Sequence, residues 1–330
     1  MQIRSITVAD ADFSAWYDVH RCATEADFPN GPHFSERELR VVHEPHEHSA
    51  RKLWIAEENG RVVGAAQLAL PLRDNLKLAE LEIFVRPEAR RQGIGTALLD
   101  TVRECAREHS RTSLLTYLDA PSQRQATAGT EFLEHHGFTQ RIVEIARVQR
   151  TPFDLDAIAK AEDHAKQYAT DYQILTWRGR VPAEYVEEYA RLEARMSTDA
   201  PLGELEYEPE VWDEARVRRS EERTERMGRS NWTAVAMAPD GTMAGVTRIV
   251  LADDSDAAAY QDTTLVDPAH RGHRLGLLLK AANLRNLLAA RPGVEAIWTW
   301  NADSNNHMIS INETLGYRVE GWTPGYQRDL

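Results

Sequence analysis

The chain contains an internal repeat, and this feature limits its fold more than any other. Asn59–Gly64 (NGRVVG) is similar to Asp240–Gly245 (DGTMAG), and Val85–Gly95 (VRPEARRQGIG) is similar to Val266–Gly276 (VDPAHRGHRLG). Both pairs are separated by the same offset of 181 residues. Because several matches at one register rarely arise by chance, the sequence predicts two copies of one domain.

The expected secondary structure follows the same order in each copy. An amphipathic helix is followed by two strands about a Gly turn and by a third strand that leads into an Arg- and Gly-rich loop. A helix, a strand, a last helix and a final strand come next, and the last helix ends at Gly137 or Gly316, as helix C-termini prefer. Alternating strands and helices predict an α/β fold. We expect domains at 1–150 and 172–330, joined by a polar, helical linker at 151–171.

The composition excludes several classes of protein. The 330 residues carry 52 acidic and 39 basic side chains, a net charge of −13, which disfavours binding to nucleic acid or to anionic lipid. No apolar run reaches the roughly 20 residues that a membrane-spanning helix needs, and the first residues lack the apolar core of a secretory leader. The two cysteines, Cys22 and Cys105, fit a reducing compartment. We therefore expect a cytoplasmic protein.

The loop between the third strand and the next helix has the chemistry of a phosphate site. In the first copy, Arg90–Gly95 (RRQGIG) combines two arginines with two glycines. Glycines let the backbone come close to a ligand, and the first N–H groups of the following helix favour an anion. The spacing matches neither the G-x-G-x-x-G fingerprint nor a Walker loop. The loop predicts a pyrophosphate site.

These residues resemble the loop of the GNAT N-acetyltransferases, [Q/R]-x-x-G-x-[G/A] after a V-x-P step. Arg90, Gly93 and Gly95 match this pattern, whereas the second copy matches at Arg271 and Gly276 and has Arg274 in place of the first glycine. The resemblance implies two tandem GNAT domains, each a mixed, mostly antiparallel sheet flanked by helices. It also implies that acetyl-CoA is the acyl donor and that no metal is needed. The implied donor-binding residues are Val85, Arg90, Arg91, Gln92, Gly93, Ile94, Gly95 and Thr96 in the first copy, and Val266, Arg271, Gly272, His273, Arg274, Leu275 and Gly276 in the second.

A second family motif, roughly N-x-x-A-x-x-x-Y-x-x-x-G-[F/Y], falls on the last helix. In the family its Asn contacts the pantetheine and its Tyr protonates the leaving thiolate. The second copy has Asn305 at the first position and Asn312 at the second, whereas the first copy has Ala126 and Leu133. Each copy has thus lost a different part of the motif. We consider Asn312 and the nearby Tyr317 as substitutes for the acid, with a place in the core as the alternative for the tyrosine.

Candidates for a general base lie on the strand before each loop. Glu80 and Glu82 share one face of this strand in the first copy, and the resemblance implies a base there. The alternative is a charged edge strand that prevents aggregation. In the second copy Gln261 and Thr263 take these positions, and Asp262 lies one residue out of phase.

The resemblance implies direct transfer of an acetyl group to a primary amine of a small molecule or peptide. One copy would be catalytic and the other degenerate, an arrangement distantly similar to that of mycothiol synthase. We expect the C-terminal copy to act, because it keeps Asn305 and carries an additional loop at Met196–Pro209. Arg271→Glu should then lower turnover more than Arg90→Glu. A catalytically silent acyl-CoA-binding or assembly module is the alternative, since both acid positions are substituted.

The remaining expectations concern origin and partners. Lysine occurs only at positions 52, 77, 160, 166 and 280, against abundant arginine, as in proteins from GC-rich bacterial genomes. The expected partner is the amine acceptor, with a homodimer left open. Neither nucleic acid nor a membrane is expected.

Overall fold

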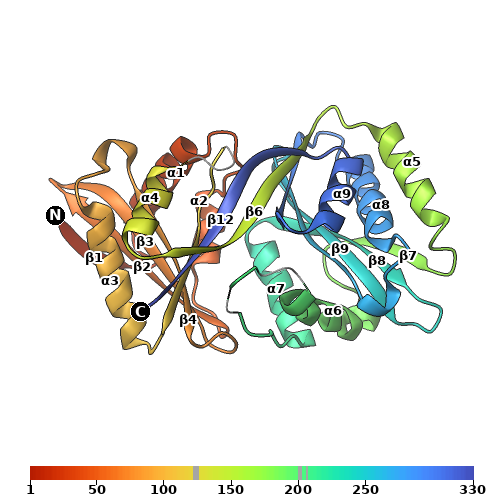
Figure 1. The fold of residues 1–330 in the computed structure, drawn as a ribbon, viewed down its shortest axis with the longest axis horizontal. Coiled ribbons are helices and arrows are strands. Elements are labelled where there is room, and N and C mark those ends of the chain that lie inside the picture. The colour runs from red at the N-terminus through yellow and green to blue at the C-terminus, as the bar shows by residue number, and fades with distance from the viewer. Residues whose placement is uncertain (122–125, 200–202, 206) are drawn as a thin grey trace. The chain divides into compact units, whose positions relative to one another are not determined.

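The chain folds into two compact units, which we call unit 1 and unit 2. The computed structural model describes residues 1–121, 126–199, 203–205 and 207–330. Unit 1 comprises the described residues of 1–144, 202–208 and 321–330, and unit 2 those of 145–201 and 209–320. Each unit therefore incorporates chain from the other half of the sequence, and the chain ends among the strands of unit 1 (Figure 1).

The sheet of unit 1 has the strand order β1-β2-β3-β4-β5, followed by the C-terminal part of β12 (Arg318–Asp329). Neighbouring strands are antiparallel except β4 and β5, which pair in parallel over Leu78–Glu80 and Ser113–Leu115 only. The elements are β1 (Gln2–Ile6), α1 (Phe13–Asp27), α2 (Glu36–Val42), β2 (Ser49–Glu58), β3 (Arg61–Pro71), β4 (Leu78–Val85), α3 (Ile94–Glu108), β5 (Ser113–Tyr117), α4 (Ala128–His135) and the first part of β6 (Thr139–Arg150).

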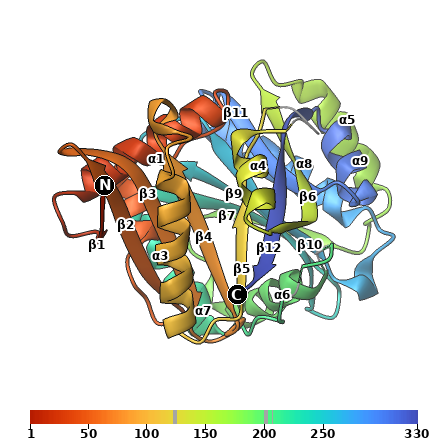
Figure 2. The same cartoon turned by 60° about the vertical axis from the view of Figure 1, so that its left-hand side comes forward.

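Helices cover both faces of this sheet because their apolar residues recur at helical spacing. On α1, Phe13, Trp16 and Val19 are fully buried in a cluster with Leu53 of β2. On α3, the residues buried against the opposite face are Ile94, Leu98, Leu99, Val102 and Ala106. Figure 2 shows α1 and α3 beside the same strands. Adjacent residues of β4 therefore face different helices.

The sheet of unit 2 has the order β6-β11-β10-β9-β8-β7, with its end of β6 supplied by residues from 145 onward. The parallel pair, β10 with β11, is again short and joins Ala259–Tyr260 to Ile297–Trp298. The elements are α5 (Leu155–Lys166), β7 (Gln173–Arg178), α6 (Val186–Asp199), α7 (Glu214–Arg226), β8 (Arg229–Met237), β9 (Met243–Ala252), β10 (Ala259–Val266), α8 (Leu275–Ala290), β11 (Ala296–Ala302), α9 (Asn306–Thr314) and β12 (Arg318–Asp329).

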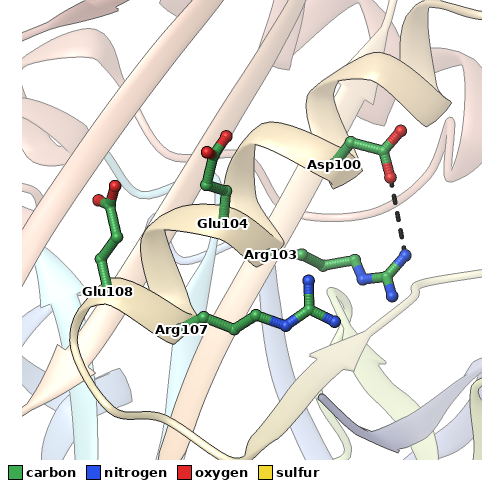
Figure 3. Close-up of a pocket in the computed structure, with 5 residues that line it drawn as sticks. All are labelled: Asp100, Arg103, Glu104, Arg107 and Glu108. Carbon is green, nitrogen blue, oxygen red and sulfur yellow. Dashed lines mark ion pairs between the residues drawn. The ribbon is translucent and has the colours of Figure 1, made fainter.

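The outer faces of the equivalent helices α3 and α8 differ. On α3 this face carries Asp100, Arg103, Glu104, Arg107 and Glu108, which point away from the helix (Figure 3). On α8 it carries the buried residues Ala281, Leu284 and Leu288, packed in one cluster with Ile158 and Ala161 of α5. The stretch expected as a linker thus contains a helix that covers α8.

The predicted fold class is confirmed. Each unit is a mixed, mostly antiparallel sheet flanked by helices, with one short parallel pair at the centre. Among the described residues, no helix combines the length and the apolar character needed to cross a membrane.

Candidate active site

The two phosphate-type loops have the same backbone conformation, with glycine in different places. Arg91 (φ 64°) and Gly93 (φ 83°) are left-handed in unit 1, and Gly272 (φ 90°) and Arg274 (φ 54°) are left-handed in unit 2. A left-handed residue other than glycine costs of order 1 kcal/mol. Arg274 therefore replaces the glycine without changing the loop, at the expense of some strain.

The first arginine of each loop binds a carbonyl of the preceding strand and an aspartate at a helix end. In unit 1, Arg90 donates from Nε to the Val85 carbonyl (3.2 Å) and from both terminal nitrogens to Asp27 at the end of α1 (2.7 and 2.9 Å). In unit 2, Arg271 donates to the Val266 carbonyl (3.4 Å) and to Asp199 at the end of α6 (3.4 Å). Both arginines thus hold the loop against the preceding strand. The two aspartates carry no local sequence signal, because they lie over 60 residues from their partners.

A cavity of about 550 Å³ lies beside the loop of unit 1, where β4 and β5 are no longer paired. Its size suits a small-molecule ligand. The expected residues that line it are Val85, Arg90, Arg91, Gly93, Ile94, Gly95 and Thr96, and lining residues that sequence reasoning missed include Ile83, Thr116, Leu118, Phe132 and His136. Gln92 is not among the lining residues; its side chain turns back to the Glu88 carbonyl (3.5 Å).

The last glycine of each loop allows a close helix contact. A Cβ at Gly95 would lie 3.2 Å from Phe132 of α4, and one at Gly276 would lie 3.1 Å from Ile311 of α9. Thr96 Oγ1 is also 3.2 Å from Nε2 of His136 at the end of α4. The glycine therefore brings the last helix against the phosphate-type loop in both units.

In unit 2 the loop is covered in part by the segment that follows α5. The hydroxyl of Tyr172 lies 3.0 Å from Nδ1 of His270, and the ring of His273 approaches the Tyr168 carbonyl (3.2 Å). The Arg274 guanidinium lies 4.4 Å from the Tyr168 ring centre. The Arg274 guanidinium, which could attract an anion to this loop, is therefore already in contact with an aromatic ring.

Among the candidate bases, Glu82 of β4 has a pKa that suits a general base. Burial raises the pKa of Glu82 to about 7, an effect that hydrogen bonding from Gln67 and the charge of Arg51 oppose. Its neighbours along the strand, Leu81 and Ile83, line the cavity beside the loop. Glu80 lies on the same face of β4 and pairs in register with Ala69 of β3. A carboxylate with a pKa near neutrality accepts a proton efficiently at physiological pH.

Asp262 forms an ion pair with Arg248 in unit 2. Arg248 of β9 donates two hydrogen bonds to one oxygen of Asp262 (2.8 and 2.5 Å). The same guanidinium donates to the Tyr189 hydroxyl (2.6 Å) and lies 3.4 Å from Glu193, both on α6. Arg248 stands at the repeat position that Gln67 occupies in unit 1. An internal cation thus neutralises the acidic groups on this face.

Asn312 and Tyr317 lie in the core of unit 2. The Asn312 side chain is fully buried; it accepts a hydrogen bond from Lys280 Nζ (2.7 Å) and donates one to Asn301 (2.5 Å). Tyr317 is 1% exposed, with the Lys280 ammonium 5.2 Å from its ring centre. Asn305 caps α9 through a hydrogen bond that its side chain accepts from the Met308 N–H (3.2 Å). Within the described residues, these contacts give each side chain a structural role.

Comparisons with known proteins agree with the repeat. A family model described as acetyltransferase (GNAT) domain matches residues 49–140. The chain is similar to a tandem GNAT protein from the clavulanic acid biosynthesis pathway, with 27% identity, a TM-score of 0.79, and coverage of 99% of this chain and 98% of the other. A GCN5-related N-acetyltransferase from Sphaerobacter thermophilus is similar in fold, with 17% identity, a TM-score of 0.69, and coverage of 99% and 95%.

The duplicated loop, the short parallel strand pair and the domain match define an acetyltransferase fold of the GNAT type. The chain has a tandem GNAT fold, and its similarity to a tandem GNAT protein extends over 99% of its length.

Proposed function

We propose that the chain is an acetyl-CoA-dependent N-acetyltransferase in which unit 1 is catalytic and unit 2 is a degenerate copy. The acceptor is a primary amine of a small molecule or peptide. The observation that carries the proposal is the position of Glu82, a carboxyl with a pKa of about 7 on the strand that lines the donor cavity. The free cysteines Cys22 and Cys105 support a reducing, cytoplasmic setting.

The residues of unit 1 fit a bound thioester donor. The loop from Arg90 to Gly95 presents backbone N–H groups and the start of α3 to a pyrophosphate. The cavity of about 550 Å³ beside it continues between Ile83 of β4 and Leu118 after β5. Acetyl-CoA would supply the acyl group as a thioester, and a backbone N–H near Val85 would polarise its carbonyl.

Glu82 then acts on the acceptor. An alkylammonium has a pKa near 10.4 and is mostly protonated at neutral pH, so Glu82 must take a proton before the nitrogen can attack. The N–C amide bond forms as the thioester C–S bond breaks. The nitrogen releases its second proton to solvent, and the leaving thiolate takes a proton from solvent. Glu82 returns its proton to solvent after the product leaves. This assignment reverses our preference for the C-terminal copy, because Arg248 already binds Asp262 there.

The central experiment replaces Glu82 by Gln and measures acetyl-CoA turnover with a panel of amines. Loss of a general base lowers the rate by about 10²- to 10⁴-fold. In the unaltered chain kcat/KM should fall as pH drops below about 7, since Glu82 becomes protonated. Asp262→Asn is the matched control and should retain turnover. An unchanged rate in Glu82→Gln, or a loss confined to Asp262→Asn, contradicts the assignment.

A second pair of variants separates the two loops. Arg90→Glu breaks the ion pair with Asp27 that fastens the donor loop of unit 1, and Arg271→Glu does the same with Asp199 in unit 2. We expect the first to lower turnover about tenfold or more and the second to have little effect. Donor binding without turnover of any amine would instead favour a silent acyl-CoA-binding module.

A further inference from the structure

Three side chains that can ligate a metal ion lie within one turn at the C-terminal end of α3. Cys105, Glu108 and His109 each place one ligand atom within 4.8 Å of the ligand atoms of the other two. The Sγ of Cys105 is 3.8 Å from Nδ1 of His109. Tetrahedral zinc, with bonds of about 2.3 Å to sulfur and about 2.0 Å to nitrogen, places two such atoms about 3.6 Å apart. The spacing therefore suits a single ion.

The three side chains can be reached from solvent. Cys105 is half-buried, and Glu108 and His109 are exposed. Within the described helix, Glu108 forms no ion pair with Arg103 or Arg107, which lie on the adjoining face (Figure 3). Nδ1 of His109 lies 2.8 Å from the Cys105 carbonyl, a contact that rotation of the exposed ring releases. An ion can therefore reach all three groups while the helix stays folded.

The local charges favour a bound cation. The C-terminal end of a helix carries partial negative charge, and His109 is the C-cap residue of α3. Burial raises the pKa of the Cys105 thiol, the charge of Lys52 opposes this effect, and the charge of Glu108 adds to it. The thiolate and the Glu108 carboxylate are thus close enough to repel each other. A divalent ion bound to both removes this repulsion.

We propose that Cys105, Glu108 and His109 bind one Zn²⁺ ion, with a water molecule as the fourth ligand. Thiolate, imidazole and carboxylate are the groups that bind zinc in proteins, whereas Mg²⁺ and Ca²⁺ take oxygen ligands. The Cys105 thiol releases its proton to solvent when the ion binds. The bound ion joins three side chains of one helical turn and so holds the end of α3 together.

The zinc site belongs to unit 1 and is separate from its phosphate-type loop. The loop lies at the start of α3, whose 15 residues extend over roughly 20 Å. At the equivalent positions of α8, 181 residues later, the chain has Asn286, Ala289 and Ala290, and the two alanines offer no ligand atom. One ion per chain is therefore expected from the repeat, and the inference does not depend on the proposed function.

The test measures Zn²⁺ binding to the full chain, kept reduced with a phosphine, by competition with a chromophoric chelator. Cys105→Ser and His109→Gln should each weaken binding by about tenfold or more, because even the outer partners of metal ligands typically contribute that much. Cys22→Ser and Glu104→Gln are the matched controls and should bind as the unaltered chain does. They change the other cysteine and the carboxylate one turn before Glu108 (Figure 3).

Co²⁺ identifies the sulfur ligand directly, since Zn²⁺ has a filled d shell and gives no such spectrum. A Co²⁺–thiolate bond absorbs in the near ultraviolet, and this band should appear in the unaltered chain and be absent from Cys105→Ser. Equal Zn²⁺ affinity of Cys105→Ser and the unaltered chain would overturn the inference, as would Co²⁺ binding without the band. A loss of binding confined to Cys22→Ser would also overturn it. None of these readouts requires acetyl transfer.

Discussion

Units 1 and 2 share the same order of strands and helices. They differ in the charged side chains on the two paired strands that precede the loop, β3 and β4 in unit 1 and β9 and β10 in unit 2. Unit 1 has Gln67 and Glu82 at two paired positions of β3 and β4, and the repeat places Arg248 and Thr263 there in unit 2. Arg248 binds Asp262 and lies close to Glu193. Unit 2 thus has a guanidinium in direct contact with an acidic side chain where unit 1 has the Gln67 amide.

A second contrast lies in the cores of the two units, below the phosphate-type loops. In unit 1 the helices α3 and α4 place Leu99 and Leu133 in the core, whereas the equivalent positions of unit 2 hold Lys280 and Asn312. Burial lowers the pKa of Lys280 to about 7. An apolar pair in unit 1 thus corresponds to a polar pair in unit 2, and one member of each pair, Leu133 or Asn312, stands at the tyrosine position of the GNAT motif. Unit 2 therefore keeps polar groups at this point but uses them for internal hydrogen bonds.

Removal of residues 321–330 should have the largest effect, and it should act on unit 1 alone. The deletion exposes the edge of β5 and removes the hydrogen bonds from Thr323 to Asp119 and from the Tyr326 hydroxyl to Glu134 (3.1 Å). We expect unit 1 to lose its cooperative thermal transition and the chain to lose acetyl transfer, while unit 2, which contains none of these residues, still unfolds cooperatively.

Tyr326→Phe is the control for this deletion. It removes one hydroxyl and should cost only about 1 kcal/mol of the stability of unit 1. A truncated chain that still binds acetyl-CoA at the first loop would show that the C-terminal strand is dispensable.

The placement of residues 321–330 in unit 1 also shows the limit of what the sequence could predict. The repeat, the α/β fold and the loops at Arg90 and Arg271 follow from spacing, because glycines and strand periods are local signals. Both halves end in a similar strand, so the pattern does not say which sheet receives residues 321–330. The contacts of Arg90 with Asp27 and of Glu82 with Gln67 depend on tertiary packing in the same way.

The packing of the predicted linker helix also had a signal in the sequence. The outer face of the helix that starts at Leu275 carries Ala281, Leu284 and Leu288, whereas the equivalent face after Ile94 is charged. An apolar outer face on a helix requires a covering element. The sequence therefore contained evidence that residues 155–166 form a packed helix and not only a linker.

The next largest effect concerns the buried Lys280. Because its folded pKa of about 7 lies below the usual value of 10.5, the unfolded chain binds one proton more than the folded chain between these pH values. The stability of unit 2 should therefore rise from pH 7 to pH 9 by roughly 1.4 kcal/mol per pH unit. In Lys280→Leu/Asn312→Leu, which reproduces the Leu99–Leu133 pair, this rise should disappear.

Urea unfolding at the two pH values measures this difference. Lys160→Leu, on the exposed side of α5, is the control and should keep the rise of the unaltered chain. If the double variant showed the same pH dependence as the unaltered chain, Lys280 would not be its source.

The smallest expected effect comes from the different positions of glycine in the two loops. Gly93→Ala places a Cβ in open space at φ 83°, so backbone strain alone should lower the stability of unit 1 by about 1 kcal/mol. Arg274→Gly removes the corresponding strain in unit 2 but also the contact of the guanidinium with Tyr168, which contributes about 0.5–1 kcal/mol at an exposed site. The gain should therefore be smaller than the loss at Gly93. Thermal melting of the two variants checks the order, and equal and opposite shifts would mean that the Arg274–Tyr168 contact contributes nothing.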